Sequence, residues 1–203
     1  METQVFELVE CVSCGAKHKM LKTPKRLKHF DIYSDGKTVS SELSDALEVT
    51  RCLSCNSFFW IDDAKSYTSD EAMGDIPMIV ALNVEEYISL LNDDSCFKTT
   101  DEEEILRREL LWAFNDRIRN GKQKFENDLE QAVWRENMNV LLKLLDETDV
   151  FSRLQRAEIA REIGEFELAL KILNGIKDAS LYDIKKQMIN AINHKEVEVL
   201  KFE

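Results

Sequence analysis

Two short stretches decide the fold of this chain: Cys11-Val-Ser-Cys14-Gly15 and Cys52-Leu-Ser-Cys55-Asn56. Each stretch places two thiols on one tight turn, and together they offer the four sulfur ligands that zinc prefers in closed, tetrahedral sites. We predict that a single Zn²⁺ is bound by Cys11, Cys14, Cys52 and Cys55. The predicted role is structural, because four protein ligands leave no coordination position for a substrate.

Other interpretations of these residues have less support. A rubredoxin-type iron site would suit Cys14-Gly15, but Asn56 stands where its second glycine is expected. A thioredoxin-like redox pair normally stands alone in a βαβ unit. His18 and His29 are alternative ligands that a set of four cysteines does not require. The fifth cysteine, Cys96, is expected to be a lone, buried thiol.

The segments around the cysteines have the alternation of short strands. Strands are predicted over Val5–Val9, His29–Tyr33, Glu48–Arg51 and Ser57–Ile61, with a turn at Ser34-Asp35-Gly36 and a short helix over 41–47. Gly15 suits a backbone that turns with positive φ after the second thiol of its pair. Strand, cysteine turn and strand, repeated twice, resembles a zinc ribbon.

A connector and then a run of helices follow. Residues 62–82 contain Gly74 and Pro77 among acidic and small polar residues, which indicates a domain boundary near 70–80. Asn83 with Glu86, and Thr100 with Glu103, are typical of helix N-termini. Further helices are predicted over 123–147, 152–163, 165–173 and 179–193, and the final residues 197–202 alternate like a strand or form a frayed tail.

The apolar spacing predicts which helix faces are buried. Leu106, Leu110, Phe114 and Ile118 recur every four residues with Leu111 alongside, which makes one apolar stripe. In the next helix the residues expected in the core are Leu129, Val133, Val140, Leu141 and Leu144.

One helical pair resembles a tetratricopeptide repeat. Gly164 stands at the turn, Phe166 and Ala169 stand where the second helix packs on the first, and Leu173 follows one turn on. The match covers about one repeat, residues 150–175, and lacks the usual proline after the second helix. A second repeat is not found at the 34-residue period of this family. The resemblance therefore implies a tetratricopeptide-like hairpin in a small bundle.

The whole chain resembles a group of small bacterial proteins that join an N-terminal CxxC…CxxC module to repeat-like helices. The residues that carry this resemblance are Phe59-Trp-Ile-Asp-Asp-Ala64 and the Trp112-x-x-Asn115 helix, in addition to the cysteines. It implies no activity. The predicted fold class is α+β, with a β-rich zinc ribbon over 1–75 and an all-α, tetratricopeptide-like domain over 76–203.

Composition narrows the location and the partners. The N-terminus lacks the basic and apolar regions of a signal peptide. The sequence contains no run of about 18 apolar residues, which a membrane-spanning helix would need. With cysteines arranged for metal binding, we expect a cytoplasmic protein. The net charge is −12, and residues 31–116 carry twenty acids against six Lys/Arg. The negative electrostatic field of such a chain repels phosphate groups, so it disfavours nucleic acid as the main partner.

Four other segments are candidates for function. Residues 17–29 hold six Lys/Arg and no acid, which suits either a phosphate-contacting loop or a solvated turn. Phe58, Phe59 and Trp60 offer stacking surfaces or packing. Trp112 and Asn115, with Arg117, are expected to face the ribbon and lock a domain interface. The acids Asp62 and Asp63, and Glu102 to Glu104, could bind a hard cation but are more typical of solvated or capping residues.

Three functions follow from these features. The first is a non-enzymatic protein-interaction module that binds a basic partner, as an immunity protein, antitoxin or adaptor. The alternative is a nucleic-acid-associated regulator that uses the ribbon and the basic loop 17–29. An enzyme is the weakest hypothesis, because the sequence contains neither a loop that would bind phosphate nor a motif that pairs a nucleophile with a base. We therefore predict no catalytic residue.

Overall fold

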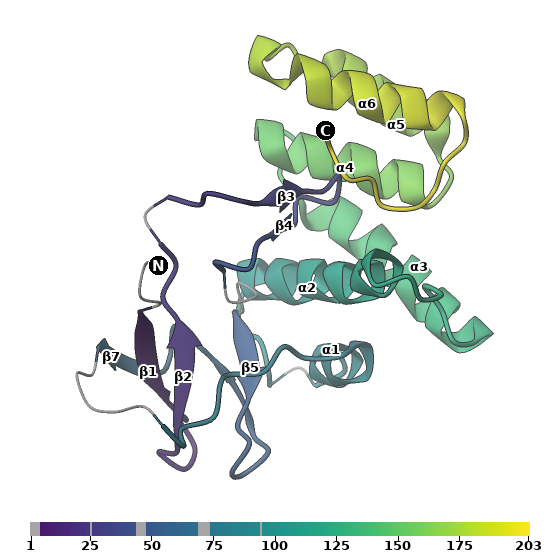
Figure 1. Cartoon of the computed structure of the whole chain (residues 1–203). Coiled ribbons are helices and arrows are strands. Elements are labelled where there is room, and N and C mark those ends of the chain that lie inside the picture. Colours follow the sequence, from purple (N-terminus) through teal and green to yellow (C-terminus); the bar gives the residue numbers. More distant parts are fainter. Residues whose placement is uncertain (1–4, 25, 44–47, 69–73, 94) are drawn as a thin grey trace. The chain divides into compact units, whose positions relative to one another are not determined.

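The computed structural model describes residues 5–24, 26–43, 48–68, 74–93 and 95–203. The described residues form short antiparallel strands in the N-terminal part and six α-helices in the C-terminal part (Figure 1). The predicted α+β class is therefore confirmed at this level. Of the helix predicted over 41–47, residues 44–47 lie outside the described residues. None of the described helices has the length and apolarity needed to cross a bilayer.

The chain divides into two compact units. The ribbon unit comprises residues 1–30 and 39–83, and the helical unit comprises residues 31–38 and 84–203. The sequence-based division into 1–75 and 76–203 differs from this partition chiefly at residues 31–38, which join the helices although they lie far from them along the chain. The polypeptide consequently passes between the units three times.

The ribbon unit contains two antiparallel sheets. Strand β1 (Phe6–Glu10) pairs with β2 (Lys17–Leu21) on one edge and with β7 (Lys65–Thr68) on the other. Strand β5 (Val49–Arg51) pairs with β6 (Phe58–Trp60). One buried cluster beside the cysteine turns contains Val9, Cys11, Cys52 and Phe59, with Ala16, Met20 and Ala64 packed against them. Further buried apolar residues of this unit are Leu8, Leu21, Val49, Ile79 and Leu82. Two of the four buried members of this cluster are cysteines, so a metal ion bound by them would add stability to a small unit.

The helical unit has a much larger core. Its helices are α1 (Val84–Leu91), α2 (Thr100–Arg119), α3 (Asp128–Leu144), α4 (Val150–Glu162), α5 (Phe166–Gly175), the 3₁₀ turn η1 (Ala179–Leu181) and α6 (Tyr182–Asn193). Helices α4, α5 and α6 share a buried cluster that includes Ala157, Ala160, Ala169, Leu173, Ile176 and Met188. The predicted apolar stripe of α2 is confirmed, since Leu106, Leu110 and Phe114 are buried.

Two sequence-based details of the helices are wrong. The N-cap of α2 is Thr99, whose hydroxyl accepts a hydrogen bond from the amide of Glu102, so the capping box lies one residue before the predicted one. Helix α3 begins at Asp128, not near 123, and Leu129 is 74% exposed. The prediction is confirmed for Leu141, which is fully buried; the other buried apolar residues here are Trp134, Met138 and the C-cap residue Leu145.

Residues 31–38 form a hairpin within the helical unit, and the C-terminal tail pairs with it. Strands β3 (Asp31–Ile32) and β4 (Thr38–Val39) make a two-stranded sheet. The Ser34 amide donates to the Leu200 carbonyl, and the Phe202 amide donates to the Ile32 carbonyl, both at 2.9 Å. Residues 200–202 therefore pair with the hairpin through an isolated antiparallel bridge between Tyr33 and Lys201, and the trace in Figure 1 shows the tail returning toward β3.

A buried ionic network fixes the tip of this hairpin. The Asp35 side chain is fully buried, and it accepts from the Arg119 guanidinium and from Asn115 Nδ2, the latter at 2.9 Å. The same Asn115 nitrogen donates to Glu162 Oε1 at 2.9 Å, and Lys124 Nζ lies 2.8 Å from Glu162 Oε2. Burial raises the pKa of both carboxyls, and the neighbouring cations oppose that effect.

A second buried ion pair holds the tail. Arg161 and Glu158 on α4 are both fully buried and joined by two hydrogen bonds, at 2.9 and 2.6 Å. Arg161 also donates to the carbonyls of Glu196 and Glu198, at 2.5 and 2.7 Å. A side chain from the last turn of α4 thereby anchors the segment that closes the hairpin.

Candidate metal centre

The four predicted cysteines come together at the turns of the two hairpins. Cys11 Sγ lies 3.8 Å from Cys55 Sγ, and Cys14 Sγ lies 3.7 Å from Cys52 Sγ. All four sulfur atoms lie within 4.8 Å of one another. Four sulfurs placed at the usual Zn–S bond length around one ion are about 3.8 Å apart. The cluster therefore fits zinc with little rearrangement.

The two cysteine turns have nearly the same backbone geometry. In the first, the Gly15 amide donates to the Cys11 carbonyl at 2.9 Å, and in the second the Asn56 amide donates to the Cys52 carbonyl at 2.8 Å. Gly15 has φ 72° and Asn56 has φ 60°, so both residues are left-handed. Asparagine tolerates this region better than most residues. The missing second glycine is thus no obstacle to a paired site.

Ser57 distinguishes the second turn from the first. Its hydroxyl lies 2.9 Å from Cys55 Sγ and 3.6 Å from Cys11 Sγ, whereas Ala16 stands at the equivalent position of the first turn. Hydrogen bonds to thiolate ligands orient them and tune their basicity. Sequence reasoning missed Ser57, although the alignment of CGA with CNS would have revealed it.

His18 supports the second turn and is not placed among the ligands. Its side chain is buried, and Nε2 accepts a hydrogen bond from the Leu53 amide at 3.2 Å. Since Leu53 lies between the two cysteines of that turn, His18 steadies the loop on which Cys52 and Cys55 are carried. The metal-ligating group found among the described residues here contains the four cysteines and no histidine.

The thiols differ in their affinity for protons. Burial raises the pKa of Cys11, but hydrogen bonds from the backbone of Cys14 and from Ser57 outweigh it and lower the pKa to about 6. A hydrogen bond from the Ala16 backbone lowers the pKa of Cys14, but the neighbouring Cys55 and Cys52 sulfurs raise it to about 12. Crowded thiols resist losing every proton unless a cation compensates the charge.

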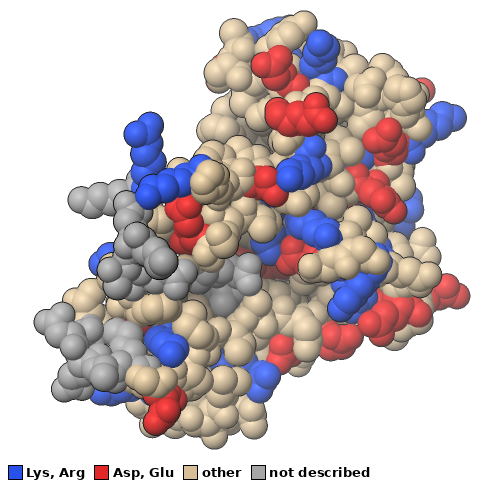
Figure 2. Space-filling view, viewed as in Figure 1, with Lys and Arg blue, Asp and Glu red and all other residues tan. Residues whose placement is uncertain are grey.

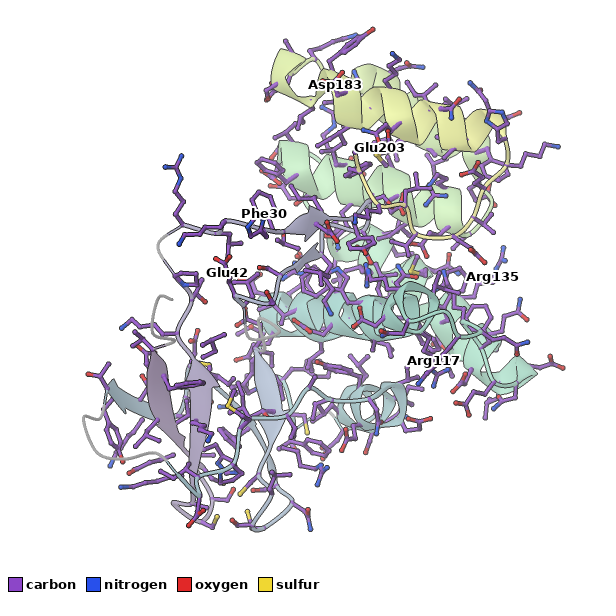
Figure 3. The ribbon with its side chains drawn as sticks, viewed as in Figure 1. Phe30, Glu42, Arg117, Arg135, Asp183 and Glu203 are labelled. Atoms are coloured by element: carbon purple, nitrogen blue, oxygen red, sulfur yellow. The ribbon has the colours of Figure 1, made fainter. Side chains whose placement is uncertain are left out.

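Each cysteine pair contains one buried and one exposed residue. Cys11 and Cys52 are 2% and 0% exposed, whereas Cys14 and Cys55 are exposed. Figure 3 shows sulfur atoms near the turn ends of the β1–β2 and β5–β6 hairpins. Cys96 is not part of the cluster; it is half-buried, and burial with the Asp93 charge raises the pKa of its thiol. A raised pKa makes Cys96 a poor nucleophile.

The basic stretch 17–29 is only partly a loop. Its first five residues form β2, and Lys22 makes an ion pair with Glu7 at 2.6 Å. The Lys17 ammonium lies 5.5 Å from the centre of the Tyr67 ring. Lys25 lies outside the described residues. Of the aromatic set, Phe59 is buried in the ribbon core, while Phe58 and Trp60 are half-buried.

Trp112 and Asn115 meet the hairpin tip within the helical unit. Trp112 Nε1 donates to the Asp35 carbonyl at 3.0 Å, and Asn115 donates to the Asp35 carboxylate. Both side chains therefore hold residues 31–38, a segment that the sequence-based boundaries assigned to the ribbon.

The acidic candidates have structural explanations. Asp62 and Asp63 are exposed in a turn, and Glu102 caps α2. A different cluster, Glu85, Glu126 and Glu130, surrounds Arg117, which is labelled in Figure 3. Arg117 binds both oxygens of Glu130, at 2.6 and 3.0 Å, and lies 3.6 Å from Glu85 and 3.7 Å from Glu126. The positively charged guanidinium of Arg117 already lies where a metal ion would have to bind between these three carboxylates.

Comparison of the chain with protein-family models, with curated proteins and with solved structures finds no match. The functional assignment consequently depends on the chain's own residues. Those residues form a closed set of four thiols with the spacing that zinc requires.

Proposed function

We propose that this chain is a non-enzymatic protein-interaction module that contains a structural zinc ion and binds a basic protein. The observation that carries the proposal is the cluster of Cys11, Cys14, Cys52 and Cys55, which is compatible with a closed zinc site. A closed site supplies folding free energy to a small unit and offers no position for substrate activation.

Charge supports the basic partner. The chain carries a net charge of −12. Around Arg117, three carboxylates accompany one guanidinium, and Glu85 and Glu126 keep side-chain exposures of 64% and 69%. Figure 2 shows acidic and basic side chains interspersed over the visible face of the helical unit. A basic partner would be steered to the acidic excess by long-range attraction.

The helical unit is the proposed scaffold for binding. Helices α4 and α5 pack as an antiparallel pair that turns at Gly164, with Ala157, Ala160 and Ala169 fully buried between them. This packing supports the resemblance to a tetratricopeptide hairpin, a design that presents helix faces to other proteins. An immunity, antitoxin or adaptor role in the cytoplasm is the form of the proposal that we favour.

The test is an affinity capture from source cells at low salt, with and without added nuclease. The captured protein is then purified and titrated by calorimetry. We expect to capture a basic protein that stays bound after nuclease treatment. The double variant Glu85→Gln/Glu126→Gln should bind this protein more weakly, and its affinity should depend less on salt concentration. The matched control, Lys22→Gln/Arg26→Gln, should bind as tightly as the unmodified chain.

The opposite pattern would support the nucleic-acid alternative. Captured material that is destroyed by nuclease, and lost in Lys22→Gln/Arg26→Gln, would contradict the proposal and assign binding to the basic stretch 17–29. Zinc content, measured on every variant, separates a binding defect from an unfolded ribbon.

A further inference from the structure

A cavity of about 500 Å³ lies within the helical unit. Its walls come from the hairpin residues 32–36, from α2, from α4, from η1 with α6, and from the C-terminal tail. This volume lies in the range of small-molecule sites in proteins. The cavity does not involve the cysteines, so an inference about it is independent of the proposed function.

Most of the wall is apolar. The side chains that define it include Tyr33, Trp112, Leu154, Ile184, Met188 and Phe202. Phe151, at the start of α4, lines the same cavity and is 69% exposed. An apolar cavity with an exposed aromatic ring at its edge suits the hydrocarbon or aromatic body of a ligand.

Several polar groups of the wall are already satisfied by protein. Trp112 Nε1 donates to the Asp35 carbonyl, and the Asp35 carboxylate accepts from Lys37, Asn115 and Arg119. The Ser34 hydroxyl donates to Glu158 and accepts from the Leu200 amide. These groups face their protein partners, so they do not select the polar end of a ligand.

Two nitrogen-bearing side chains of the wall can donate hydrogen bonds to a ligand. Gln155 Nε2 is buried and has no partner among the described residues. Arg108 uses Nη1 to bind Glu104, which leaves further N–H groups of the guanidinium, and its central carbon lies 5.8 Å from the Trp112 ring centre. A buried donor without an acceptor is costly, and a ligand acceptor would remove that cost.

We propose that this cavity binds a small molecule with an apolar body and a carboxylate head, which accepts hydrogen bonds from Gln155 and Arg108. The guanidinium favours a charged acceptor over a neutral one. Because the wall is made from segments distant in the sequence, the bound molecule would also stabilise the helical unit by mass action.

The experiment uses the full-length zinc-loaded protein and decanoate, below its micelle concentration, as the probe. Binding is followed by the indole N–H resonances in ¹⁵N NMR spectra, and Trp112→Phe assigns the Trp112 signal. We expect saturable shifts of the Trp112 resonance and little change at Trp134, which packs against Phe125 outside this cavity. Decanol, with an uncharged head, should bind at least tenfold more weakly.

The deciding variant is Gln155→Glu, which replaces the donor with a negative acceptor of the same shape. It should weaken decanoate binding at least tenfold. Gln131→Glu, the same change at an exposed position of α3, is the matched control and should bind as the unmodified chain does. Shifts that do not saturate, or equal decanoate affinity in Gln155→Glu and the unmodified chain, would overturn the proposal.

Discussion

The ribbon unit and the helical unit are stabilised by different means. The ribbon gathers Val9, Cys11, Cys52 and Phe59 into one buried cluster, two members of which are themselves metal-ligand candidates. The helical unit buries a large apolar cluster and, beside it, a balanced set of ionised side chains around Asp35 and Arg161. The proposed zinc ion would therefore stabilise one unit from outside the chain, whereas the other unit uses charges that the chain supplies itself.

Removing the metal should produce the largest difference between the units. In Cys52→Ser, or after chelation, we expect the ribbon to unfold, because structural zinc contributes about 10–16 kcal/mol to small domains of this kind. The helical signal in circular dichroism should largely persist. Zinc content by mass spectrometry and the dispersion of β1, β2 and β5 amide resonances are the measurements.

Cys96→Ser is the control for the zinc prediction, since that thiol lies outside the cluster. A ribbon that keeps dispersed amide resonances without metal would contradict the assigned role of the cysteines.

The buried network of the helical unit should give the next largest effect. Asp35→Ala leaves the buried Arg119 with only the partly exposed Asp116 as a carboxylate partner, and removing one partner of a buried pair typically costs about 3–5 kcal/mol. The measurement is urea-induced unfolding followed by helical circular dichroism. Asp31→Ala is the control, because its pair with Lys201 is roughly half exposed and contributes less than about 1 kcal/mol. Equal losses in the two variants would show that burial does not distinguish these pairs.

The pair of Arg117 and Glu130 makes a prediction about pH. Hydrogen bonds from Arg117 lower the pKa of Glu130 in the folded state. Its contribution to stability is therefore complete above the unfolded pKa of about 4.3 and is lost as the pH falls through the folded value. Glu130→Gln should lose roughly 1.5–3 kcal/mol at pH 7 and show a shallower decline below pH 4.3.

Stability curves between pH 7 and pH 2.5 test this prediction. The exposed Glu136→Gln on the same helix should follow the unmodified chain. Parallel acid declines in Glu130→Gln and the unmodified chain would rule out the proposed linkage.

The smallest effect concerns a single backbone angle. Gly164 has φ +86° at the turn between α4 and α5, and nothing lies within 4 Å of an added Cβ. Gly164→Ala should therefore cost about 1–2 kcal/mol through conformation alone. Calorimetric unfolding should show the loss in the helical unit only, while Gly74→Ala, whose glycine lacks a positive φ, should leave that unit unchanged.

Local features of both units could be predicted from sequence. The cysteine turns, the positive φ of Gly15 and the apolar stripe of α2 all follow from residues close together along the chain. The hairpin assignment could not be predicted in the same way. Asp35 is 80 residues from Asn115 and 84 from Arg119, and nothing near Asp35-Gly36 signals those partners.

The buried ion pair on α4 was missed for a related reason. Glu158 and Arg161 are typical surface residues of a helix, and their full burial depends on the tail that covers them. Leu129 shows the converse error, since an apolar residue near the start of α3 was assigned to the core and is exposed. In each case the tertiary environment, rather than residue type, decided burial.

The pairing of residues 31–38 with the tail also has a consequence for synthesis on the ribosome. The hairpin emerges early, yet Leu200, the backbone partner of Ser34, is 166 residues later, so the helical unit cannot be completed until Leu200 has been synthesised. Cys14 and Cys52 flank the hairpin, and zinc captured by the nascent ribbon would convert it from an open segment into a tethered loop. Such closure would reduce the conformational entropy that is lost when residues 200–202 later pair with the hairpin. Metal supply during translation would thereby influence how quickly the second unit matures.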